Sequence, residues 1–584
     1  MELPFLTELN ETRTAVGTFL GLNRNPGRAE GELADMENLS SDRFPLLSTR
    51  KRRGIHAAPG HCTGLIAKDT LCYTDGSCFV MDGYRVELGL SDAPKQLVSM
   101  GSHVIILPDK KYINTADLTD SGNLEAEFTG NITLTLCAGD GTGLSPDYSQ
   151  PETPADPAEG ALWLDTGAAP ACLRRYAGST GVWAEVPTTF VRLSAPGLGA
   201  AFAAGDGVRI RGLAGVAGLS VPEGYSVIAC RGQDFLVVPG LICAPAEAEN
   251  VTVERRMPEL DFVIESENRL WGCRYGTAAN GETVNEIYAS KLGDFRNWNC
   301  FQGVSTDSYA VSLGTDGAFT GAVNHLGYPL FFKETCIHKV YGSYPAAYRL
   351  QTVVCPGVQR GSEKSLGELG GVLYYKAPDG VYAFDGSLPR KVSGALGQTL
   401  FRNAAGGALG DKYYISMADP AGDFHLLVLD TARGLWHRED GTRAEDFCPC
   451  RGELYFLDHT DGKIRTVLGS GTPEAEPVSF RAVTGELGLD SPDCKFVSRL
   501  NLRLELGAGA ELRVFVNYDS GPDWERVCTL TGTGLGSISV PVKLRRCDHF
   551  RLRLEGTGDA AVYGIVKTVS PGSDARRRTG LHLG

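Results

Sequence analysis

The sequence lacks the long apolar runs and the N-terminal pattern that direct a chain into or across a membrane. No stretch of about 18 consecutive apolar residues occurs, so no transmembrane helix is expected. Met1–Phe5 carries no basic segment followed by an apolar one, so no signal peptide is expected. The 16 cysteines are scattered singly through strand-like segments and do not form a compact disulfide framework. We therefore expect folding in a reducing cytoplasm with free thiols.

Positive charge is also scarce. The chain has 56 Lys and Arg against 70 Asp and Glu, a formal net charge of −14. Such a chain has no broad attraction for phosphate backbones, which argues against packaging or reading nucleic acid by charge neutralisation. A surface past which nucleic acid slides is not excluded.

Motifs that carry catalysis or hold metals are missing as well. The phosphate loop G-x-x-x-x-G-K-[ST], the elbow G-x-S-x-G and the zinc motif H-E-x-x-H do not occur. Cys448 and Cys450, flanked by His437 and His459, lack a second matched pair, so we interpret them as buried thiols on a strand. Asp519–Gly521 is interpreted as a turn. We expect no catalytic residue, no cofactor and no metal.

What the sequence has in abundance is glycine, with 73 residues, and aromatic side chains, with 21 Tyr and 23 Phe. Apolar strands separated by Asp-Gly turns recur, as in 372–375, 378–380 and 381–384, whereas helical periodicity is scarce. Hairpins repeating every 30 to 45 residues predict a β-propeller. Blade-like units lie near 60–90, 96–118, 258–298, 318–345, 365–393, 405–439 and 446–467. We predict an all-β protein with a six- or seven-bladed propeller; a series of β-sandwiches is the alternative that the same turns permit.

Two regions depart from this repeating hairpin pattern. One contains a Pro-rich stretch, 150–157, followed by the Trp-Asp-Thr module of Leu162–Thr166. The other alternates strictly, as in Leu500–Leu506, which is typical of an antiparallel sandwich. The predicted organisation is a lead-in with the first blades at 1–125, an inserted small β lobe with its Pro-rich linker at 126–256, the remaining blades at 257–475, and a C-terminal antiparallel β-sandwich with a flexible tail at 476–584.

The sequence from Asp261 to Ser393 resembles that of a known family. Asn-Arg-Leu-Trp at 268–271, Asn-Glu-Ile-Tyr-Ala-Ser at 285–290 and Gly-Asp-Phe-Arg-Asn-Trp at 293–298 are similar to the propeller of phage tail nozzle proteins, also called tail tubular protein B or packaged-DNA stabilisation proteins. The residues that carry the resemblance are interpreted as structural: Asn268, Arg269, Trp271, Tyr288, Ser290, Asp294, Trp298, Gly342, Asp379, Gly380, Asp385 and Gly386.

The resemblance implies a structural component of a bacteriophage tail. Such a protein would form a homo-oligomeric ring, a hexamer by resemblance, and would contact other tail or connector proteins. DNA would pass through its lumen without specific binding, so we expect a lumen lined more by Asp and Glu than by Lys and Arg. The chain would be made in the cytoplasm of a bacterial host and end in the virion tail. The simplest nozzle proteins do not carry an insert in the form of residues 126–256. The resemblance therefore does not decide whether the protein belongs to a short tail or to a longer one.

Two alternatives remain at this stage. One is a virion protein that binds carbohydrate or a receptor through the aromatic residues of the insert. The other is a propeller glycosidase, because the segment from Ser290 to Trp298 resembles the Asp-box turn of sialidases. In that box the Asp caps a hairpin and the Trp packs between blades, so it is a folding device. A glycosidase needs paired carboxylates or an arginine cluster in addition.

Overall fold

The computed structural model describes residues 11–278, 281–489, 494–543 and 545–571. The predicted flexible tail, which contains Arg576–Arg578, and the segment Met1–Phe5 lie outside these residues. Within them the chain is all-β, with 54 strands and four short 3-10 helices, η1 (Leu198–Ala201), η2 (Pro345–Ala347), η3 (Glu363–Ser365) and η4 (Gly394–Leu396). In the part of the chain so described, no helix has the length and apolarity needed to cross a membrane.

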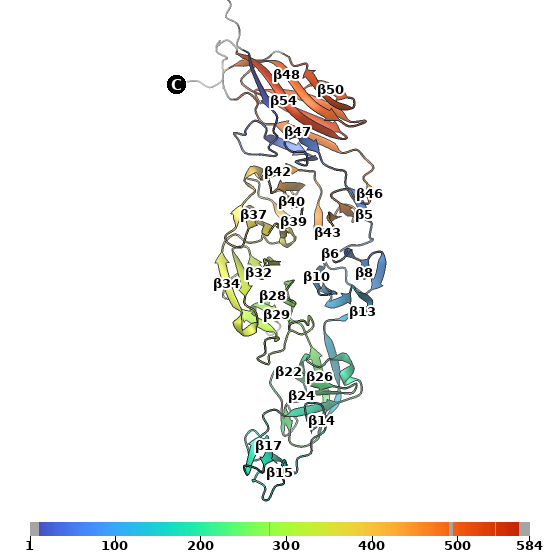
Figure 1. Cartoon of the computed structure of the whole chain (residues 1–584), viewed down its shortest axis with the longest axis vertical. Coiled ribbons are helices and arrows are strands. Elements are labelled where there is room, and N and C mark those ends of the chain that lie inside the picture. The colour runs from blue at the N-terminus through green and yellow to red at the C-terminus, as the bar shows by residue number, and fades with distance from the viewer. Residues whose placement is uncertain (1–10, 279–280, 490–493, 544, 572–584) are drawn as a thin grey trace, which may run out of the picture. The chain divides into compact units, whose positions relative to one another are not determined.

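Two compact units make up the chain. Unit 1 comprises 1–87, 332–337 and 353–584, and unit 2 comprises 88–331 and 338–352. Both units contain antiparallel sheets in which strands that follow one another in sequence also pair in space (Figure 1). Separate domains are defined by parts of the chain that stay folded on their own. The separation of the insert and of the sandwich from the propeller therefore stays a prediction.

Unit 1 holds four of these up-and-down sheets. Their strands are β6 (Leu65–Ala67), β7 (Leu71–Asp75), β8 (Cys78–Met81) and β9 (Tyr84–Glu87); β35 (Gly367–Leu369), β36 (Val372–Ala377), β37 (Gly380–Phe384) and β38 (Arg390–Lys391); β39 (Arg402–Leu409), β40 (Lys412–Ala418), β41 (Phe424–Asp430) and β42 (Leu435–Arg438); and β43 (Ala444–Cys450), β44 (Glu453–Asp458) and β45 (Ile464–Thr466). Each hairpin turns where the sequence predicts, because Gly, Asp and Asn relieve the strain of the tight turn.

Unit 2 holds two further sheets of this kind, and residues 321–354 form one more. The two sheets are β10 (Gln96–Met100), β11 (His103–Leu107), β12 (Lys111–Asn114) and β13 (Asp117–Asn123); and β27 (Phe262–Ser266), β28 (Arg269–Thr277), β29 (Thr283–Ala289) and β30 (Tyr309–Ser312). The sheet formed by residues 321–354 is β31 (Gly321–His325), β32 (Tyr328–Lys333), β33 (Cys336–Tyr341) and β34 (Arg349–Val354).

The described residues therefore contain seven blade sheets, one at each position that the sequence predicts. Consecutive four-stranded antiparallel sheets of this size are the blades of a β-propeller. The sequence underestimates the extent of the third blade, because β30 follows β29 only after a 19-residue loop, 290–308. The fold is an all-β propeller with an inserted β lobe and a C-terminal antiparallel β-sandwich.

The last blade is completed by a strand from the N-terminal part of the chain. β5 (Gly54–Ala57) pairs antiparallel with β45 and also with the short β46 (Thr472–Pro473). Arg53 precedes β5 and forms buried ion pairs with Glu439 at 2.7 Å and with Asp440 at 2.9 Å. Burial opposes ionisation of Asp440, but the attraction to Arg53 and Arg50 and the hydrogen bonds from Thr442 together outweigh it and lower the pKa of Asp440 to about 2. This network fixes the N-terminal segment against the end of the propeller.

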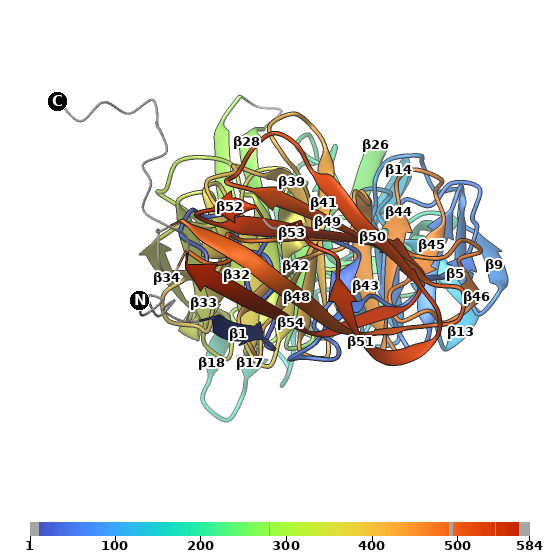
Figure 2. The ribbon, with the colours of Figure 1, turned by 90° about the horizontal axis from the view of Figure 1, so that it is seen from above.

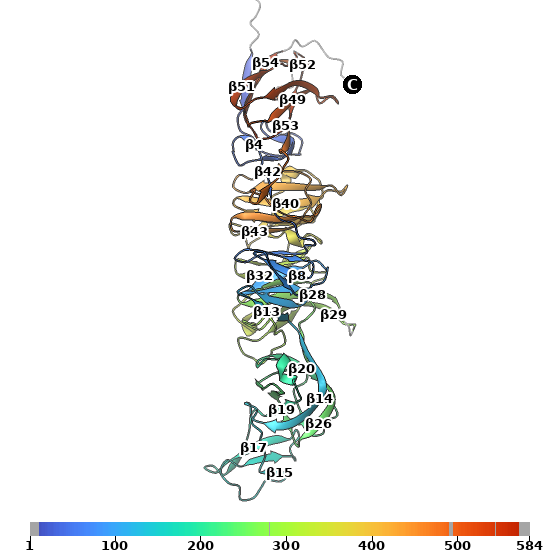
Figure 3. The ribbon, with the colours of Figure 1, turned by 90° about the vertical axis from the view of Figure 1, so that its right-hand side faces the viewer.

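The inserted lobe has its own hydrophobic core, drawn from residues 132 to 253. Its main sheet runs in the order β22-β20-β26-β14-β19-β24-β23, in which β14 (Ala126–Cys137) enters the lobe and β26 (Ala246–Arg255) leaves it as paired antiparallel strands (Figure 3). The other strands are β19 (Phe190–Ser194), β20 (Gly207–Arg211), β22 (Tyr225–Val227), β23 (Cys230–Arg231), β24 (Phe235–Pro239) and the pair β21 (Leu219–Ser220) with β25 (Leu241–Ile242). A second, four-stranded sheet consists of β15 (Tyr148–Gln150), β16 (Leu162–Asp165), β17 (Cys172–Ala177) and β18 (Val182–Glu185).

The C-terminal strands form the predicted sandwich (Figure 2). One sheet runs β3-β4-β54-β48-β51, with β1 on β54 and β52 on β48, and the other runs β2-β47-β53-β49-β50. The alternation from Leu500 to Leu506 falls in β48, where Leu500, Leu502 and Leu504 are buried in one cluster with Leu512 and Leu552 of the other sheet. The strands are β47 (Ser479–Thr484), β48 (Lys495–Leu506), β49 (Glu511–Tyr518), β50 (Glu525–Thr531), β51 (Gly534–Val540), β52 (Arg546–Cys547), β53 (Phe550–Thr557) and β54 (Ala560–Pro571).

The N-terminal lead-in contributes strands to this sandwich. β1 (Thr12–Val16) pairs with β54, β2 (Leu33–Glu37) pairs with β47, and β4 (Leu47–Thr49), which follows β3 (Leu39–Ser40), pairs with β54. The sequence analysis groups this segment with the first blades, because local alternation gives no information on a partner strand more than 400 residues away. The two ends of the described chain thus meet in one sheet.

Candidate functional site

The structure brings seven of the twelve resemblance residues together in and around one blade. Asn268, Arg269, Trp271 and Tyr288 belong to the hairpins of β27–β29, and Ser290, Asp294 and Trp298 follow β29. The other five lie in other sheets: Gly342 follows β33, Asp379 and Gly380 form the β36–β37 turn, and Asp385 and Gly386 follow β37. No common site for all twelve is therefore indicated, and each group has a local role.

Arg269 organises the long loop between β29 and β30. Its buried guanidinium donates to the carbonyl oxygens of Ser290 at 2.7 Å, Asp307 at 2.5 Å and Ser305 at 2.9 Å. Burial lowers the pKa of Arg269 below its usual range, but an arginine stays charged in proteins, so these are charge-assisted hydrogen bonds. One side chain at the start of β28 thereby holds both ends of the loop.

Asp307 fixes the middle of the same loop. One of its carboxylate oxygens accepts the backbone N–H groups of Gln302 at 2.5 Å, Gly303 at 2.6 Å and Val304 at 3.1 Å. A carboxylate that receives three backbone donors defines the path of the chain around it. The loop 301–308 is consequently held in one conformation although it is irregular.

This loop presents apolar side chains to solvent at the edge of a hollow. Phe301 is 58 % exposed and Val304 is 50 % exposed, and across the hollow Tyr344, which precedes η2, is 47 % exposed. The hollow has a volume of about 410 Å³ and is completed by Tyr309 and Pro345. Large apolar side chains grouped at a fixed concave surface are typical of an interaction site. We call this the apolar hollow.

A three-ring cluster supports the apolar hollow from beneath. Tyr309 lies 6.0 Å from Trp271 and 5.0 Å from Tyr348, measured between ring centroids, and Trp271 lies 5.0 Å from Tyr348. Edge-to-face contacts of this kind add to the stability gained from burial. Burial also raises the pKa of Tyr309 and of Tyr348, so both phenols are neutral at physiological pH. The hollow therefore rests on packed aromatic rings, and Asp307, which also lines it, has its carboxylate held by backbone N–H groups of the loop.

Trp298 packs in the interior of unit 2, and Asp294 closes the turn that precedes it. Trp298 is buried in one cluster with Val98 of β10 and Val263 of β27, so its indole packs between two blades. Asp294 accepts the backbone N–H of Arg296 at 3.0 Å, which closes the turn. Both side chains serve the packing of unit 2.

Asn297 connects this turn to the inserted lobe. Its side-chain amide donates to Asp206 at 2.9 Å and to Asp294 at 2.6 Å, and its carbonyl oxygen accepts the backbone N–H of Gly207 at 3.0 Å. Asp206 also forms a buried ion pair with Arg255 at the end of β26. No local sequence pattern predicts the roles of Asn297, Arg255 or Asp307, because their partners are distant in the sequence or are backbone groups.

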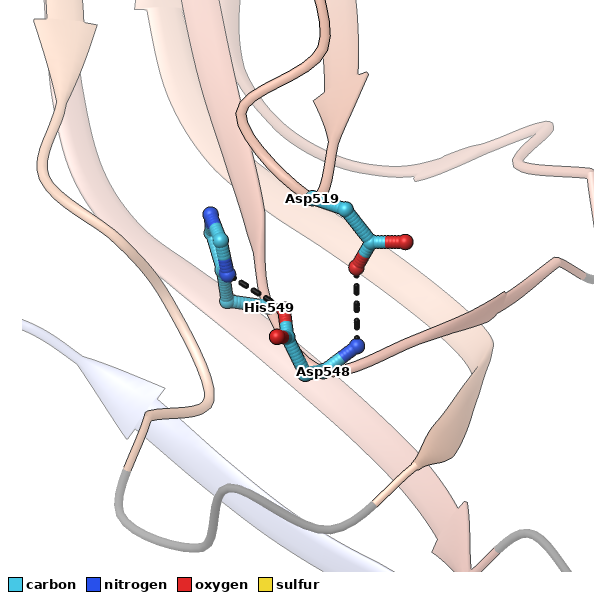
Figure 4. Close-up of side chains that lie close together, drawn as sticks. All are labelled: Asp519, Asp548 and His549. Atoms are coloured by element: carbon cyan, nitrogen blue, oxygen red, sulfur yellow. Dashed lines mark hydrogen bonds and ion pairs between the residues drawn. The ribbon is translucent and has the colours of Figure 1, made fainter. Parts of the chain in front are cut away.

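A second group of polar side chains lies at one turn of the sandwich (Figure 4). His549 contacts Asp548 through Nδ1 at 2.5 Å and Ser520 through Nε2 at 2.7 Å, while Asp519 accepts the backbone N–H of Asp548 at 2.9 Å. Both ring nitrogens of His549 are thus hydrogen-bonded within the group. The N–H of Gly521 donates to the Tyr518 carbonyl at 3.0 Å. The group closes a turn, as the sequence predicts for Asp519–Gly521.

The cysteine pair on the last blade also has the predicted environment. Cys448 and Cys450 are free, buried residues of β43. Burial raises the pKa of both thiols, so they are protonated at physiological pH in the free protein.

Comparison with known proteins gives no family. No family model and no curated protein matches the chain. Among solved structures, an exo-beta-1,3-galactanase from Phanerochaete chrysosporium is 11 % identical, with 52 % of this chain and 94 % of that one covered and a TM-score of 0.22. A sialidase from Trypanosoma rangeli is 8 % identical, with 96 % and 95 % covered and a TM-score of 0.22. Likeness at this level gives no information on activity, and the propeller assignment follows from the sheets themselves.

Proposed function

We propose that this protein is a structural subunit of a bacteriophage tail and that it assembles with further copies of itself through the apolar hollow. The observation that carries the proposal is the pair of exposed apolar side chains, Phe301 and Val304, on a loop that Arg269 and Asp307 hold in place. Exposed apolar surface is costly for an isolated chain and becomes favourable when a partner covers it.

The rigidity of the loop supports an assembly role. Association costs free energy for every loop and side chain that must be ordered, and a loop already fixed in the free subunit avoids that cost. The exposed apolar residues Leu388 and Leu400 of unit 1, at 66 % and 61 %, are of a size to enter a hollow of about 410 Å³ on another copy. A contact between different surfaces of identical subunits generates a ring when the rotation closes.

The polar side chains that fix the loop beside the hollow make structural hydrogen bonds, which supports a role without catalysis. Arg269 donates to the Ser290 carbonyl, the Ser290 hydroxyl accepts the N–H of Leu270 in β28, and Asp294 accepts the N–H of Arg296. In the proposed tail, the subunits form a ring with sixfold symmetry, other tail or connector proteins bind its ends, and DNA passes through an acidic lumen. The resemblance of 268–298 to nozzle proteins is the reason to place the ring in a tail.

The assembly proposal is tested by the mass and shape of the purified protein. We expect light scattering after size exclusion to give an oligomer at micromolar concentration and electron microscopy to show rings with a central channel. Val304→Asp places a charge in the hollow and should shift the protein toward the monomer. Val182→Asp is the matched control, because Val182 is 55 % exposed in the inserted lobe, and it should leave the mass unchanged.

Two results would overturn the proposal. A wild-type protein that stays monomeric at high micromolar concentration would show that the chain does not self-associate. An oligomer that Val304→Asp does not weaken would place the interface elsewhere and disprove the role of the apolar hollow.

A further inference from the structure

The four-stranded sheet of the inserted lobe has one face in the core and one face outside it. Leu164 and Leu173 are paired in register and buried in the core of the lobe. Because side chains alternate along a strand, their neighbours Trp163 and Arg174, which are paired in the same register, point to the opposite face. Residues that are paired in register on neighbouring strands point to the same side, so this face extends over all four strands. Its aromatic members are Tyr148, Trp163, Tyr176 and Trp183, which we call the aromatic face.

Trp183 is the centre of the aromatic face. Its ring centroid lies 5.4 Å from that of Trp163, 5.3 Å from that of Tyr176 and 6.2 Å from that of Tyr148. Trp163 is buried, with its indole N–H donating to the Gln150 carbonyl at 2.9 Å, whereas the other three rings keep part of their surface in contact with solvent. The cluster thus forms a firm aromatic platform that ends at the protein surface.

Fixed polar groups lie beside this platform. Asp165 pairs with Arg174 at 3.1 Å, and its other oxygen accepts the backbone N–H groups of Gly167 and Ala168, each at 3.1 Å. The Arg174 guanidinium also lies over the Trp163 ring, 5.7 Å from its centroid. A carboxylate and a guanidinium held in place next to partly exposed rings match a ligand that has both apolar C–H faces and hydroxyl groups.

The local charge selects among such ligands. Residues 147–186 carry six carboxylates against two arginines, a net charge of −4. Aromatic platforms that stack nucleic acid bases lie in positively charged grooves, because the phosphates must be neutralised. An acidic surround repels nucleic acid and anionic sugars, and it leaves neutral sugars unaffected.

We propose that the aromatic face binds neutral hexose units of a saccharide. A pyranose ring stacks its C–H face on Trp183, with the ring of Tyr176, tilted by 54° from the indole, against its edge. Its hydroxyl groups bond to Asp165 and Arg174. This binding function goes beyond the assembly role and does not depend on it, because it uses different residues and a different part of unit 2.

The test uses the full-length protein and soluble neutral oligosaccharides of glucose, mannose and N-acetylglucosamine. Titration calorimetry and tryptophan fluorescence should report saturable binding of at least one of them. Trp183→Ala should weaken that binding by about tenfold or more, as loss of a stacking ring does elsewhere. Tyr148→Ala is a second variant that leaves the central ring in place and should weaken binding less. Val182→Ala, the exposed neighbour of Trp183, is the control and should bind like the wild type.

Three outcomes would overturn the inference. These are no binding of any of the three sugars at millimolar concentration, preferential binding of polysialic acid or single-stranded DNA, and unchanged affinity in a folded Trp183→Ala protein. The mass of Trp183→Ala by light scattering separates the two proposals, because we expect it to equal that of the wild type whatever the sugar result.

Discussion

The side-chain amide of Asn297 donates a 2.9 Å hydrogen bond to the carboxylate of Asp206, and both side chains are buried. The two residues are 91 positions apart, one in the turn after β29 and the other at the start of β20. Because Asp206 also pairs with Arg255, this one carboxylate joins the inserted lobe to the blade that carries the apolar hollow. The charge of Arg255 is tolerable in the interior only while Asp206 neutralises it.

Asp206→Ala should therefore destabilise the protein by about 3–5 kcal/mol, the usual cost of leaving a buried charge without its partner. Thermal unfolding measures the change, and hydrogen exchange should locate it in β20 and β26. Asp140→Ala is the control, since Asp140 is an exposed turn residue of the same lobe, and it should leave the unfolding midpoint nearly unchanged. Equal effects of the two substitutions would show that the buried pair contributes nothing.

Arg269→Met should release the loop 301–308 while keeping an apolar stem of similar length. We expect a loss of about 3 kcal/mol, because three carbonyl groups lose a charged donor. Hydrogen exchange of the loop should accelerate, and self-association should weaken with it. Arg274→Met on the same strand removes only a half-exposed ion pair with Asp261 and should leave the loop protected. A loop that stays protected in Arg269→Met would contradict the role given to Arg269.

Stability should depend on pH through His437. Burial lowers the pKa of this imidazole to about 4 from the ordinary 6.5. The unfolded chain therefore binds a proton between pH 6.5 and pH 4 that the folded chain does not bind. The stabilisation is complete above pH 6.5 and is lost as the pH falls toward 4, and it amounts to about 3 kcal/mol. The unfolding midpoint of the wild type measured across this window reports the loss.

His437→Gln removes the titrating group, so its unfolding midpoint should change less between pH 6.5 and pH 4 than that of the wild type. His459→Gln, at an exposed histidine paired with Glu445, serves as the control and should retain the wild-type slope. The prediction is wrong if all three proteins lose stability in parallel.

A glutamate-specific protease should cut the chain first between residues 151 and 160. This segment joins β15 to β16, is largely exposed and contains Glu152 and Glu159. We expect the propeller and sandwich to keep their unfolding transition after the cut, because the core of the lobe is its own. Loss of the whole transition on cleavage would make the lobe an integral part of the propeller.

The protein should bind duplex DNA no better than an unrelated acidic protein of the same size. A conduit that attracted phosphates would hold the DNA, and each neutralised phosphate would add a steep salt dependence. The net charge of −14 instead favours weak repulsion that salt screens. Fluorescence anisotropy with a labelled duplex at low and high salt is the measurement. Tight binding that weakens steeply with salt would indicate DNA recognition and would contradict the conduit.

The sequence by itself determined the local hairpins. In the segment from Val372 to Phe384, apolar residues flank Asp379 and Gly380, and the structure has β36, this turn and β37 there. Such elements are predictable because side-chain alternation and turn conformations act over a few residues. The strict alternation of β48 and β53 likewise determined a sandwich with one buried face on each sheet.

Only the tertiary structure decided which distant segments meet. β5 completes the last blade beside β45, and β1 pairs with β54. The residues of β5 and of β1 do not specify a partner strand hundreds of positions away. The same holds for the sites. The resemblance includes Arg269, but its hydrogen bonds to Ser305 and Asp307 are made to carbonyl groups, which every residue has. These bonds fix the loop on which Phe301 and Val304 are exposed. Strand pairing and loop position are set by backbone hydrogen bonds and by the shared burial of side chains, and both are properties of the assembled chain that no single stretch of sequence records.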